Sequence, residues 1–260
     1  MTDIRYGAKT EVRSREIEAT RAEIWSEAVT AIWETDPDLI AAVLPAPLEP
    51  GPEPLVRLTI TTVTMAGLPT FGAGWFGVQA RHADRVGEYP LFMPMTTEQS
   101  VLGGRDTYGE PKKIGEVWAR RDGDRVEAGI ARMGFTICEV QGRITETREP
   151  YEKSKTDFWF KVSPSAENAG ELDQDPLLVY GEKTEKARVH EGIDGDVVLK
   201  DSPLDPIADL AIRRLVDLNW TERASTQVGR VIGPVPRQNL VPFLHQRYDD
   251  LSVLGSAGKR

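Results

Sequence analysis

The sequence predicts a single α+β domain built mainly from antiparallel β-strands. Many short segments are rich in β-branched residues and alternate apolar with polar side chains, as strands with one buried face do. Few segments space their apolar residues as a helix does, and strands and helices do not alternate regularly as in parallel α/β proteins. With 260 residues, 40% of them hydrophobic, the chain is long enough to bury a large core. We expect a polar N-terminal arm over residues 1–20 and one domain over 21–260.

The first half of the domain is predicted to hold one short helix among strands. Asp36 and Pro37 are typical of a helix start, and Pro45 begins a proline-rich connector that ends the helix. Glycines interrupt the segment before residue 75. The expected elements are a strand over 24–33, a helix over 39–44, a connector over 45–54, and strands over 56–65, 75–80 and 89–97.

The second half is predicted to continue with hairpins and to end in helices. Asp122-Gly123-Asp124 is typical of a hairpin turn. Asp205-Pro206 is typical of a helix start, and apolar residues follow it at helical spacing up to Leu218. The expected strands are 113–120, 125–132, 136–145, 158–162, 177–180, 186–190 paired with 196–199 across 192–195, and 228–235. A final short helix is expected over 239–251.

Composition excludes several classes of protein. The net charge of −9 argues against a basic nucleic-acid-binding surface. Cys138 is the only cysteine, which excludes an intrachain disulfide and fits a reducing compartment. The first residues do not resemble a signal peptide, and no apolar run reaches the roughly 20 residues of a membrane helix. We therefore expect a cytoplasmic protein without membrane or nucleic-acid partners.

The histidines do not form a metal-binding pattern. His82, His190 and His245 are far apart in the sequence, and no HExxH motif or cysteine–histidine cluster accompanies them. Phosphate-binding and dinucleotide-binding glycine motifs are also missing. We expect neither a metal nor a cofactor.

The chemically most informative stretch is 103–115, which ends in two adjacent lysines, Lys112 and Lys113, followed by an apolar strand-like run. Neighbouring residues on a strand point to opposite faces, so one of the two ammonium groups is expected to face inward. Burial disfavours the charged form of an amine, and a neutral amine attacks carbonyl carbons to give a Schiff base. A solvated lysine pair at a strand edge is the alternative.

The stretch Gly-Arg-Asp-x-x-Gly-x-Pro-Lys-Lys-Ile-Gly resembles the signature of the acetoacetate decarboxylase superfamily. The resemblance runs from about residue 36 to the C-terminus and is strongest over 45–57 and 98–115. It implies a cone-shaped β-barrel of antiparallel sheets around the lysine, with a few outer helices. It also implies that Lys112 forms the Schiff base beside Lys113 as a cationic neighbour, in a homotetramer or larger homo-oligomer.

The groups that the resemblance leads one to expect around acetoacetate are missing. Thr59 stands where one glutamate is expected, 71–75 contains no carboxylate where another is expected, and Ser26 stands near the expected arginine. We therefore expect a lyase that uses the imine on 2-oxo acids: a pyruvate aldolase-dehydratase with an aldehyde as second substrate, or a hydratase of a 2-oxo-3-enoate. The alternatives are a decarboxylase of another β-keto acid and a protein that binds a carbonyl ligand without turnover.

Glu110 is the candidate acid–base partner of Lys112. It lies two residues earlier, so on an extended segment it shares the same face. In an apolar pocket its pKa is expected to rise, which suits proton transfer; a solvated loop glutamate is the alternative. Besides Lys113, four residues are candidates for supporting or substrate-binding roles: Arg105, which could equally hold a turn, Tyr108 and Tyr248, which could equally pack as aromatics, and Gln99.

Overall fold

The computed structural model describes residues 6–7, 24–65 and 69–258. The arm predicted over residues 1–20 lies almost wholly outside this described part. Its role as a separate segment stays a prediction.

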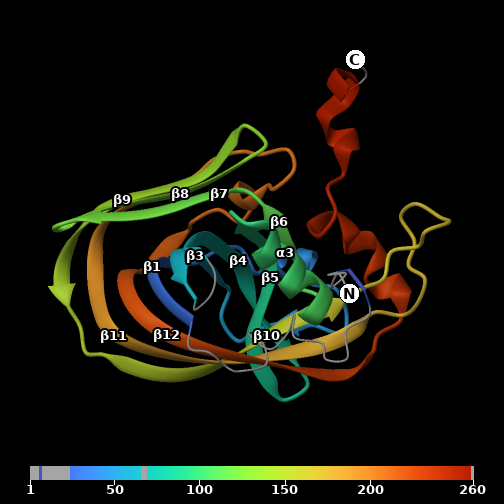
Figure 1. Ribbon diagram of the computed structural model, residues 1–260, viewed down its shortest axis with the longest axis horizontal. Coiled ribbons are helices and arrows are strands. Elements are labelled where there is room, and N and C mark those ends of the chain that lie inside the picture. The colour runs from blue at the N-terminus through green and yellow to red at the C-terminus, as the bar shows by residue number, and fades with distance from the viewer. Residues whose placement is uncertain (1–5, 8–23, 66–68, 259–260) are drawn as a thin grey trace, which may run out of the picture.

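A closed seven-stranded mixed β-barrel forms the centre of the molecule (Figure 1). Its strands run in the order β10-β5-β4-β3-β1-β12-β11, and β11 pairs again with β10 to close the ring. All neighbours are antiparallel except β5 and β10, which meet in parallel at Glu88 and Asp157. The strands are β1 (Ile24–Glu34), β3 (Leu55–Thr64), β4 (Phe71–His82), β5 (Arg85–Met95), β10 (Tyr151–Lys161), β11 (Leu177–Leu199) and β12 (Arg214–Pro234). The predicted fold class is confirmed.

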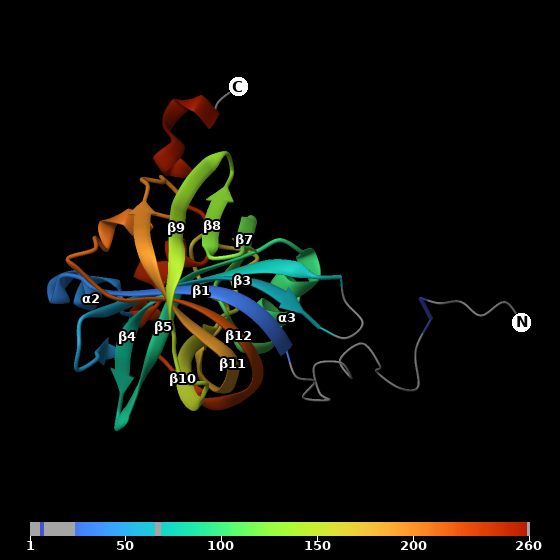
Figure 2. The same ribbon diagram turned by 90° about the vertical axis from the view of Figure 1, so that its left-hand side faces the viewer.

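Additional strands extend this barrel. The far half of β11 pairs with β9 (Phe135–Thr147), and the sheet continues through β8 (Arg125–Arg132) to β7 (Glu116–Asp122), as Figure 2 shows. β7 and β8 contact the outer face of the barrel strands. The main hydrophobic core therefore lies outside the barrel, between its wall and this second layer. Two short strands complete the sheet, β2 (Glu49–Pro50) against β4 and β6 (Lys112–Ile114) parallel to β5.

The alternation of β3 separates the two sides of the barrel wall. Val56, Leu58 and Ile60 pack into the main core outside, whereas Thr59 and Thr61 point into the barrel. The interior surface is thus free to carry polar and reactive groups, because the apolar side chains that stabilise the fold occupy the other face.

Helices are short. α2 (Pro37–Val43) begins as predicted, with the Asp36 carboxylate accepting a hydrogen bond from the Asp38 backbone N–H at 3.0 Å. α3 (Glu98–Tyr108) was not predicted. The others are 3₁₀ turns: η2 (Ile207–Asp209), η3 (Arg237–Asn239), η4 (Val241–Gln246) and η5 (Leu251–Gly258). No helix in the described part of the chain is long and apolar enough to cross a membrane.

Three predictions about the second half are wrong. The helix expected from Asp205 is a single 3₁₀ turn, and the chain then enters the 21-residue strand β12. The hairpin expected across 192–195 is an irregularity within the 23-residue strand β11, which shifts register against β9 there and continues. The final helix over 239–251 is replaced by η3, η4 and the start of η5. In each case pairing with remote strands or packing on the barrel outweighed the local pattern.

Candidate active site

A cavity of about 410 Å³ occupies one end of the barrel interior, and residues of α3 and β6 form part of its wall. Its volume lies in the range of small-molecule sites, roughly 300–1,000 Å³. Apolar side chains from β3, β4 and β5 cover one side: Val63, Phe71, Ala73, Trp75, Met93 and Met95.

Lys112 and Glu110 form an ion pair on the wall of this cavity. Lys112 Nζ lies 2.7 Å from Glu110 Oε2, and their side chains are 15% and 2% exposed. Gly109 ends α3 in a left-handed conformation (φ 84°), so the chain turns sharply into Glu110. β6 then pairs with β5 at Met93, which holds the backbone of Lys112 in register. The predicted neighbourhood of these two side chains is confirmed.

The prediction that the pKa of Glu110 rises is wrong. Burial by itself raises the pKa of this carboxyl, but the positive charge and hydrogen bond of Lys112 oppose it. A hydrogen bond from Gln227 Nε2 to Glu110 Oε1 at 2.9 Å and the charge of Lys183 act in the same direction. The net pKa lies below its usual range, so Glu110 is an anion as long as Lys112 is a cation.

Gly104 lets α3 approach this pair. A Cβ atom at Gly104 would lie 1.9 Å from Glu110 Oε2 and 2.5 Å from Lys112 Nζ. Consecutive glycines oppose helix formation, which explains why α3 was not predicted. The close approach over the ion pair requires a glycine at this position.

Lys113 points to the opposite face of β6, as the alternation predicted. Its ammonium contacts Asp205 Oδ1 and Asp249 Oδ1, both at 2.9 Å, and is only 5% exposed. Arg132 pairs with the other oxygen of each aspartate. We call Lys113, Arg132, Asp205 and Asp249 the Lys113 cluster. These aspartates balance the charge of Lys113, and its predicted role as the cationic neighbour of Lys112 stays a prediction.

The other predicted residues divide into two pairs. Tyr108 and Gln99 line the cavity. Arg105 and Tyr248 are not among the residues that line the cavity. Arg105 Nη1 donates to the Lys112 carbonyl oxygen at 3.0 Å, and its guanidinium lies 5.1 Å from the Tyr248 ring centre. Arg105 therefore holds the backbone of the reactive segment, and Tyr248 lies against its guanidinium.

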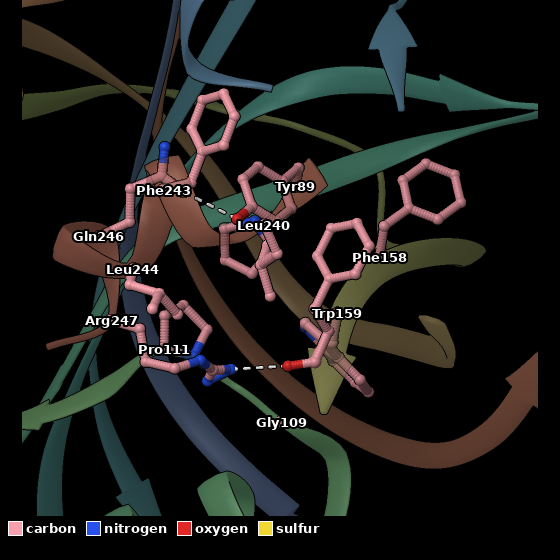
Figure 3. A pocket seen from close by; sticks show the side chains of 12 residues that line it. Tyr89, Gly109, Pro111, Phe158, Trp159, Leu240, Phe243, Leu244, Gln246 and Arg247 are labelled. Atoms are coloured by element: carbon pink, nitrogen blue, oxygen red, sulfur yellow. Dashed lines mark hydrogen bonds between the residues drawn. The ribbon is translucent and has the colours of Figure 1, made fainter. Parts of the chain in front are cut away.

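Arg247 was not predicted and supports the same segment from the C-terminal side (Figure 3). Its buried guanidinium donates to the carbonyl oxygens of Glu110 at 3.2 Å and Phe160 at 3.0 Å. Burial lowers the pKa of Arg247. Beside it, Tyr89 donates a hydrogen bond to Gln246 at 2.8 Å, which ties η4 to β5.

Sequence analysis also missed a charged wall opposite the apolar side. Lys155, Lys183, Glu185 and Arg223, from β10, β11 and β12, line the cavity. The signal in the sequence is charge at alternate positions: 153, 155 and 157, then 183 and 185. In a strand, such alternation places all these charges on one face.

The positions where charged groups are missing do line the cavity. Ser26 and Thr59 face it, as do Phe71, Ala73 and Trp75. The expectation that these positions surround the lysine without contributing charge is confirmed, but the cavity as a whole is strongly charged. Within residues 6–7, 24–65 and 69–258, no group of histidine, cysteine or acidic side chains is arranged to hold a metal ion.

Comparisons with known proteins agree with this geometry. A family model described as acetoacetate decarboxylase (ADC) matches residues 8–233, so the match begins earlier than the resemblance suggested and stops before the C-terminus. An acetoacetate decarboxylase of Clostridium botulinum is 23% identical over 197 residues, covering 71% of this chain and 77% of the relative.

Solved structures support the fold. Acetoacetate decarboxylase from Legionella pneumophila superposes with a TM-score of 0.72 and 20% identity, covering 82% of this chain and 88% of that one. The enduracididine biosynthesis enzyme MppR complexed with pyruvate gives a TM-score of 0.69 and 17% identity, covering 82% of this chain and 90% of that one. The barrel is thus shared by proteins whose names indicate different reactions.

Proposed function

The chain belongs to the acetoacetate decarboxylase family, and from that premise we propose that it is a lyase in which Lys112 forms a Schiff base with a 2-oxo acid. The proposed reaction is an aldol addition of pyruvate to an aldehyde followed by loss of water, or the reverse hydration of a 2-oxo-3-enoate. The ion pair between Lys112 and Glu110 inside the cavity is the observation that carries the proposal.

Glu110 is placed to take the proton that Lys112 must lose before it attacks a carbonyl. The charge of Lys112 is what keeps the pKa of Glu110 low, so a neutral Lys112 leaves burial as the dominant influence and the carboxyl holds the proton. The neutral amine adds to the keto carbon, and the Glu110 carboxyl returns its proton to the hydroxyl group of the adduct, which leaves as water and gives the protonated imine.

Proton transfers at the neighbouring carbon complete the reaction. The Glu110 carboxylate removes a proton from C3 of the protonated imine, and the resulting enamine attacks the aldehyde carbon. The protonated carboxyl gives its proton to the alkoxide that this addition forms. The carboxylate then removes the second proton from C3 and returns it to the new hydroxyl group, which leaves as water and gives the conjugated imine. Hydrolysis of the imine releases the 2-oxo-3-enoate, so one molecule each of pyruvate and aldehyde gives one enoate and one water.

The uncharged positions favour this reaction over acetoacetate decarboxylation. Ser26, Thr59 and the Phe71–Trp75 segment line the cavity without the charged groups expected around acetoacetate. Because no group at these positions drives the loss of carbon dioxide, the enamine persists long enough to attack an aldehyde. Decarboxylation of another β-keto acid is the second candidate, because the curated relatives carry the name acetoacetate decarboxylase.

Borohydride trapping with pyruvate tests the imine. We expect a reduced pyruvate adduct that maps to Lys112 by peptide mass spectrometry. An adduct on Lys113, or none with any keto acid, would contradict the proposal. Trapping without turnover would indicate the carbonyl-binding alternative.

Ultraviolet absorbance and carbon dioxide release separate the reactions. Pyruvate with an aldehyde should give the absorbance of a conjugated 2-oxo-3-enoate, and acetoacetate should release negligible carbon dioxide. Brisk release from acetoacetate, without enoate formation, would reject the aldolase-dehydratase proposal in favour of a decarboxylase.

We also propose a cytoplasmic homotetramer or larger homo-oligomer, with residues 21–260 as one domain. Exposed apolar side chains on η5 and on the outer end of β12 support self-association: Leu251, Val253, Val228, Val231 and Ile232. Light scattering tests assembly, with a chain ending at Asp250 as the comparison. A full-length monomer at micromolar concentration would reject it.

A further inference from the structure

Two lysines face each other on the charged wall of the cavity. Lys155 of β10 lies directly opposite Lys183 of β11, and Lys183 lies directly opposite Gln227 of β12. All three side chains point into the barrel and line the cavity. Like charges placed opposite each other on neighbouring strands destabilise a sheet. The arrangement therefore calls for a balancing anion.

The protein itself supplies that anion poorly. Within the part of the chain that the structure describes, Lys183 makes no hydrogen bond, and its one ion-pair contact is Asp157 Oδ2 at 3.9 Å. Lys155 is better satisfied, because it contacts Glu88 Oε2 at 3.0 Å. Neither oxygen of Asp157 has a hydrogen-bond partner among the described residues. Burial raises the pKa of Asp157 and lowers that of Lys183, as expected for charges that lack close partners.

The basic groups also outnumber the acidic ones. The ion pairs around Lys155 and Lys183 connect eight residues of the described chain. Five are basic, Arg57, Lys153, Lys155, Lys183 and Arg223, and three are acidic, Glu88, Asp157 and Glu185. We call these residues the cavity cluster. Four of its members line the same cavity as Lys112, and there the three cations Lys155, Lys183 and Arg223 exceed the single anion Glu185. This excess positive charge attracts an anionic ligand.

Lys183 and Lys112 occupy different positions on the cavity wall. Gln227, one strand beyond Lys183, donates to Glu110, and Glu110 in turn contacts Lys112. Within the described chain Lys183 pairs with Asp157 and makes no ion pair with Glu110, whereas Lys112 Nζ lies 2.7 Å from Glu110. A cavity of about 410 Å³ leaves room for a carbon chain that reaches from one lysine to the other.

We propose that Lys183, flanked by Lys155, binds a second carboxylate at the end of the substrate remote from the keto group. The 2-oxo acid that the cavity prefers is then a dicarboxylate, and pyruvate reacts with Lys112 without this remote contact. Lys183 supplies ammonium donors that its own surroundings leave unused, and the bound carboxylate balances the opposed lysines. This inference rests on the proposed imine chemistry for its reacting end.

Two acids of equal chain length test the second carboxylate. Borohydride trapping is measured as a function of concentration with 2-oxoglutarate and with 2-oxopentanoate, which lacks only the remote carboxylate. We expect half-saturation with 2-oxoglutarate at about 10- to 100-fold lower concentration, the usual effect of a hydrogen bond between charged groups. Equal half-saturation concentrations would overturn the proposal.

Variants assign the effect to Lys183. Lys183→Met should abolish the preference for 2-oxoglutarate over 2-oxopentanoate, and Lys183→Arg should retain it. Lys186→Met is the matched control, because Lys186 lies on the outer face of β11 and is 73% exposed. If Lys183→Met weakens trapping of pyruvate as much as that of 2-oxoglutarate, Lys183 acts on Lys112 and not on the remote carboxylate, which overturns the assignment.

Glutarate, which has no keto group, separates this inference from the imine chemistry. Calorimetry should detect glutarate binding in the native protein and in Lys112→Met, and its loss in Lys183→Met. Glutarate binding that depends on Lys183 supports the subsite even if no 2-oxo acid is trapped, in which case only the proposed function fails. Trapping without any preference and without glutarate binding overturns the subsite and leaves the proposed function standing.

Discussion

Two buried ion clusters lie on opposite sides of the β6 segment, and they differ in how well their charges are matched. In the Lys113 cluster, two cations and two aspartates are joined by contacts of 2.9 Å or less. In the cavity cluster, Lys183 has one ion-pair partner among the described residues, at 3.9 Å, and faces a second lysine. The same kinds of side chain are therefore closely paired with one another on one side of β6, whereas on the other side a lysine lacks a close partner.

The difference separates structural charge from functional charge. A buried ion pair offsets its desolvation only when its geometry is close and its charges are compensated. Around Lys113, each aspartate contacts both Lys113 and Arg132. Charges left without such partners persist where a ligand or a reaction uses them. Lys112 and Lys113 are adjacent in the sequence, yet one belongs to a site with a cavity and the other to a filled interior.

Replacing Lys112, the lysine of the pair that faces the cavity, should have the largest effect on activity. Lys112→Ala removes the only group proposed to form the imine, so turnover should fall by at least about 10⁴-fold, as expected for loss of a covalent nucleophile. Steady-state kinetics and borohydride trapping measure this loss. Retained trapping in Lys112→Ala would show that another amine, such as Lys183, forms the imine.

Neutralising the partner of Lys112 should separate imine formation from proton transfer. Glu110→Gln keeps the shape of the side chain but cannot accept a proton, so formation of the enoate should slow by about 10²–10⁴-fold. The keto acid should still be trapped on Lys112, although more slowly, because Glu110 also takes the proton from this lysine. Glu116→Gln is the control, because Glu116 is exposed on β7 beyond the lysine pair. Unimpaired turnover in Glu110→Gln would remove Glu110 from the mechanism.

A substitution in the Lys113 cluster should change the stability of the fold rather than imine formation. Lys113→Met leaves Asp205 and Asp249 with Arg132 alone, and breaking a buried ion pair in this way costs about 3–5 kcal/mol of unfolding free energy. Urea unfolding measures it, with Lys186→Met expected to change stability by less than about 1 kcal/mol. Trapping at Lys112 should survive. A stable Lys113→Met protein with lost trapping would restore Lys113 as a contributor to catalysis.

Acid should weaken the cavity cluster by a smaller amount. Burial raises the pKa of Glu88, but Lys155 and Arg57 outweigh it and lower the pKa from 4.5 to about 2. A carboxyl whose pKa is lower in the folded state stabilises the fold above pH 4.5, and this contribution disappears as the pH falls toward 2.

The contribution amounts to roughly 3 kcal/mol at most. Asp157, whose pKa is raised, changes stability in the opposite direction and offsets part of it. Urea unfolding from pH 7 downward should therefore show a flatter acid dependence in Glu88→Gln than in the native protein. Equal slopes would mean that Glu88 does not carry the acid sensitivity.

Local patterns in the sequence predicted the elements whose partners are close in the chain. Asp36 and Pro37 begin α2 by capping and by the fixed φ of proline. Asp122-Gly123-Asp124 connects β7 and β8 as a tight hairpin because its ends pair directly. In these segments the backbone hydrogen bonds are satisfied within a few residues, so local chemistry was sufficient.

Elements that depend on remote partners were not predictable in this way. β12 pairs with β1, whose residues lie almost 200 positions earlier, as Ile24 with Ser225 shows. α3 forms in spite of Gly103 and Gly104 because it packs over the reactive segment. The charge state of Glu110 also depended on distant groups, since Gln227 and Lys183 reach it from β12 and β11.

The sequence by itself determined that Lys112 and Lys113 point to opposite faces, because alternation follows from the geometry of any strand. It also determined, through the motif around them, which family the chain belongs to. Only the tertiary structure decided what each face contains. Closure of the barrel brings β10, β11 and β12 together, so that Lys155, Lys183 and Arg223 share a cavity with Lys112 while Asp205 and Asp249 enclose Lys113. Electrostatic interactions depend on distance in space, and these distances are set by strand pairing between residues far apart in the chain.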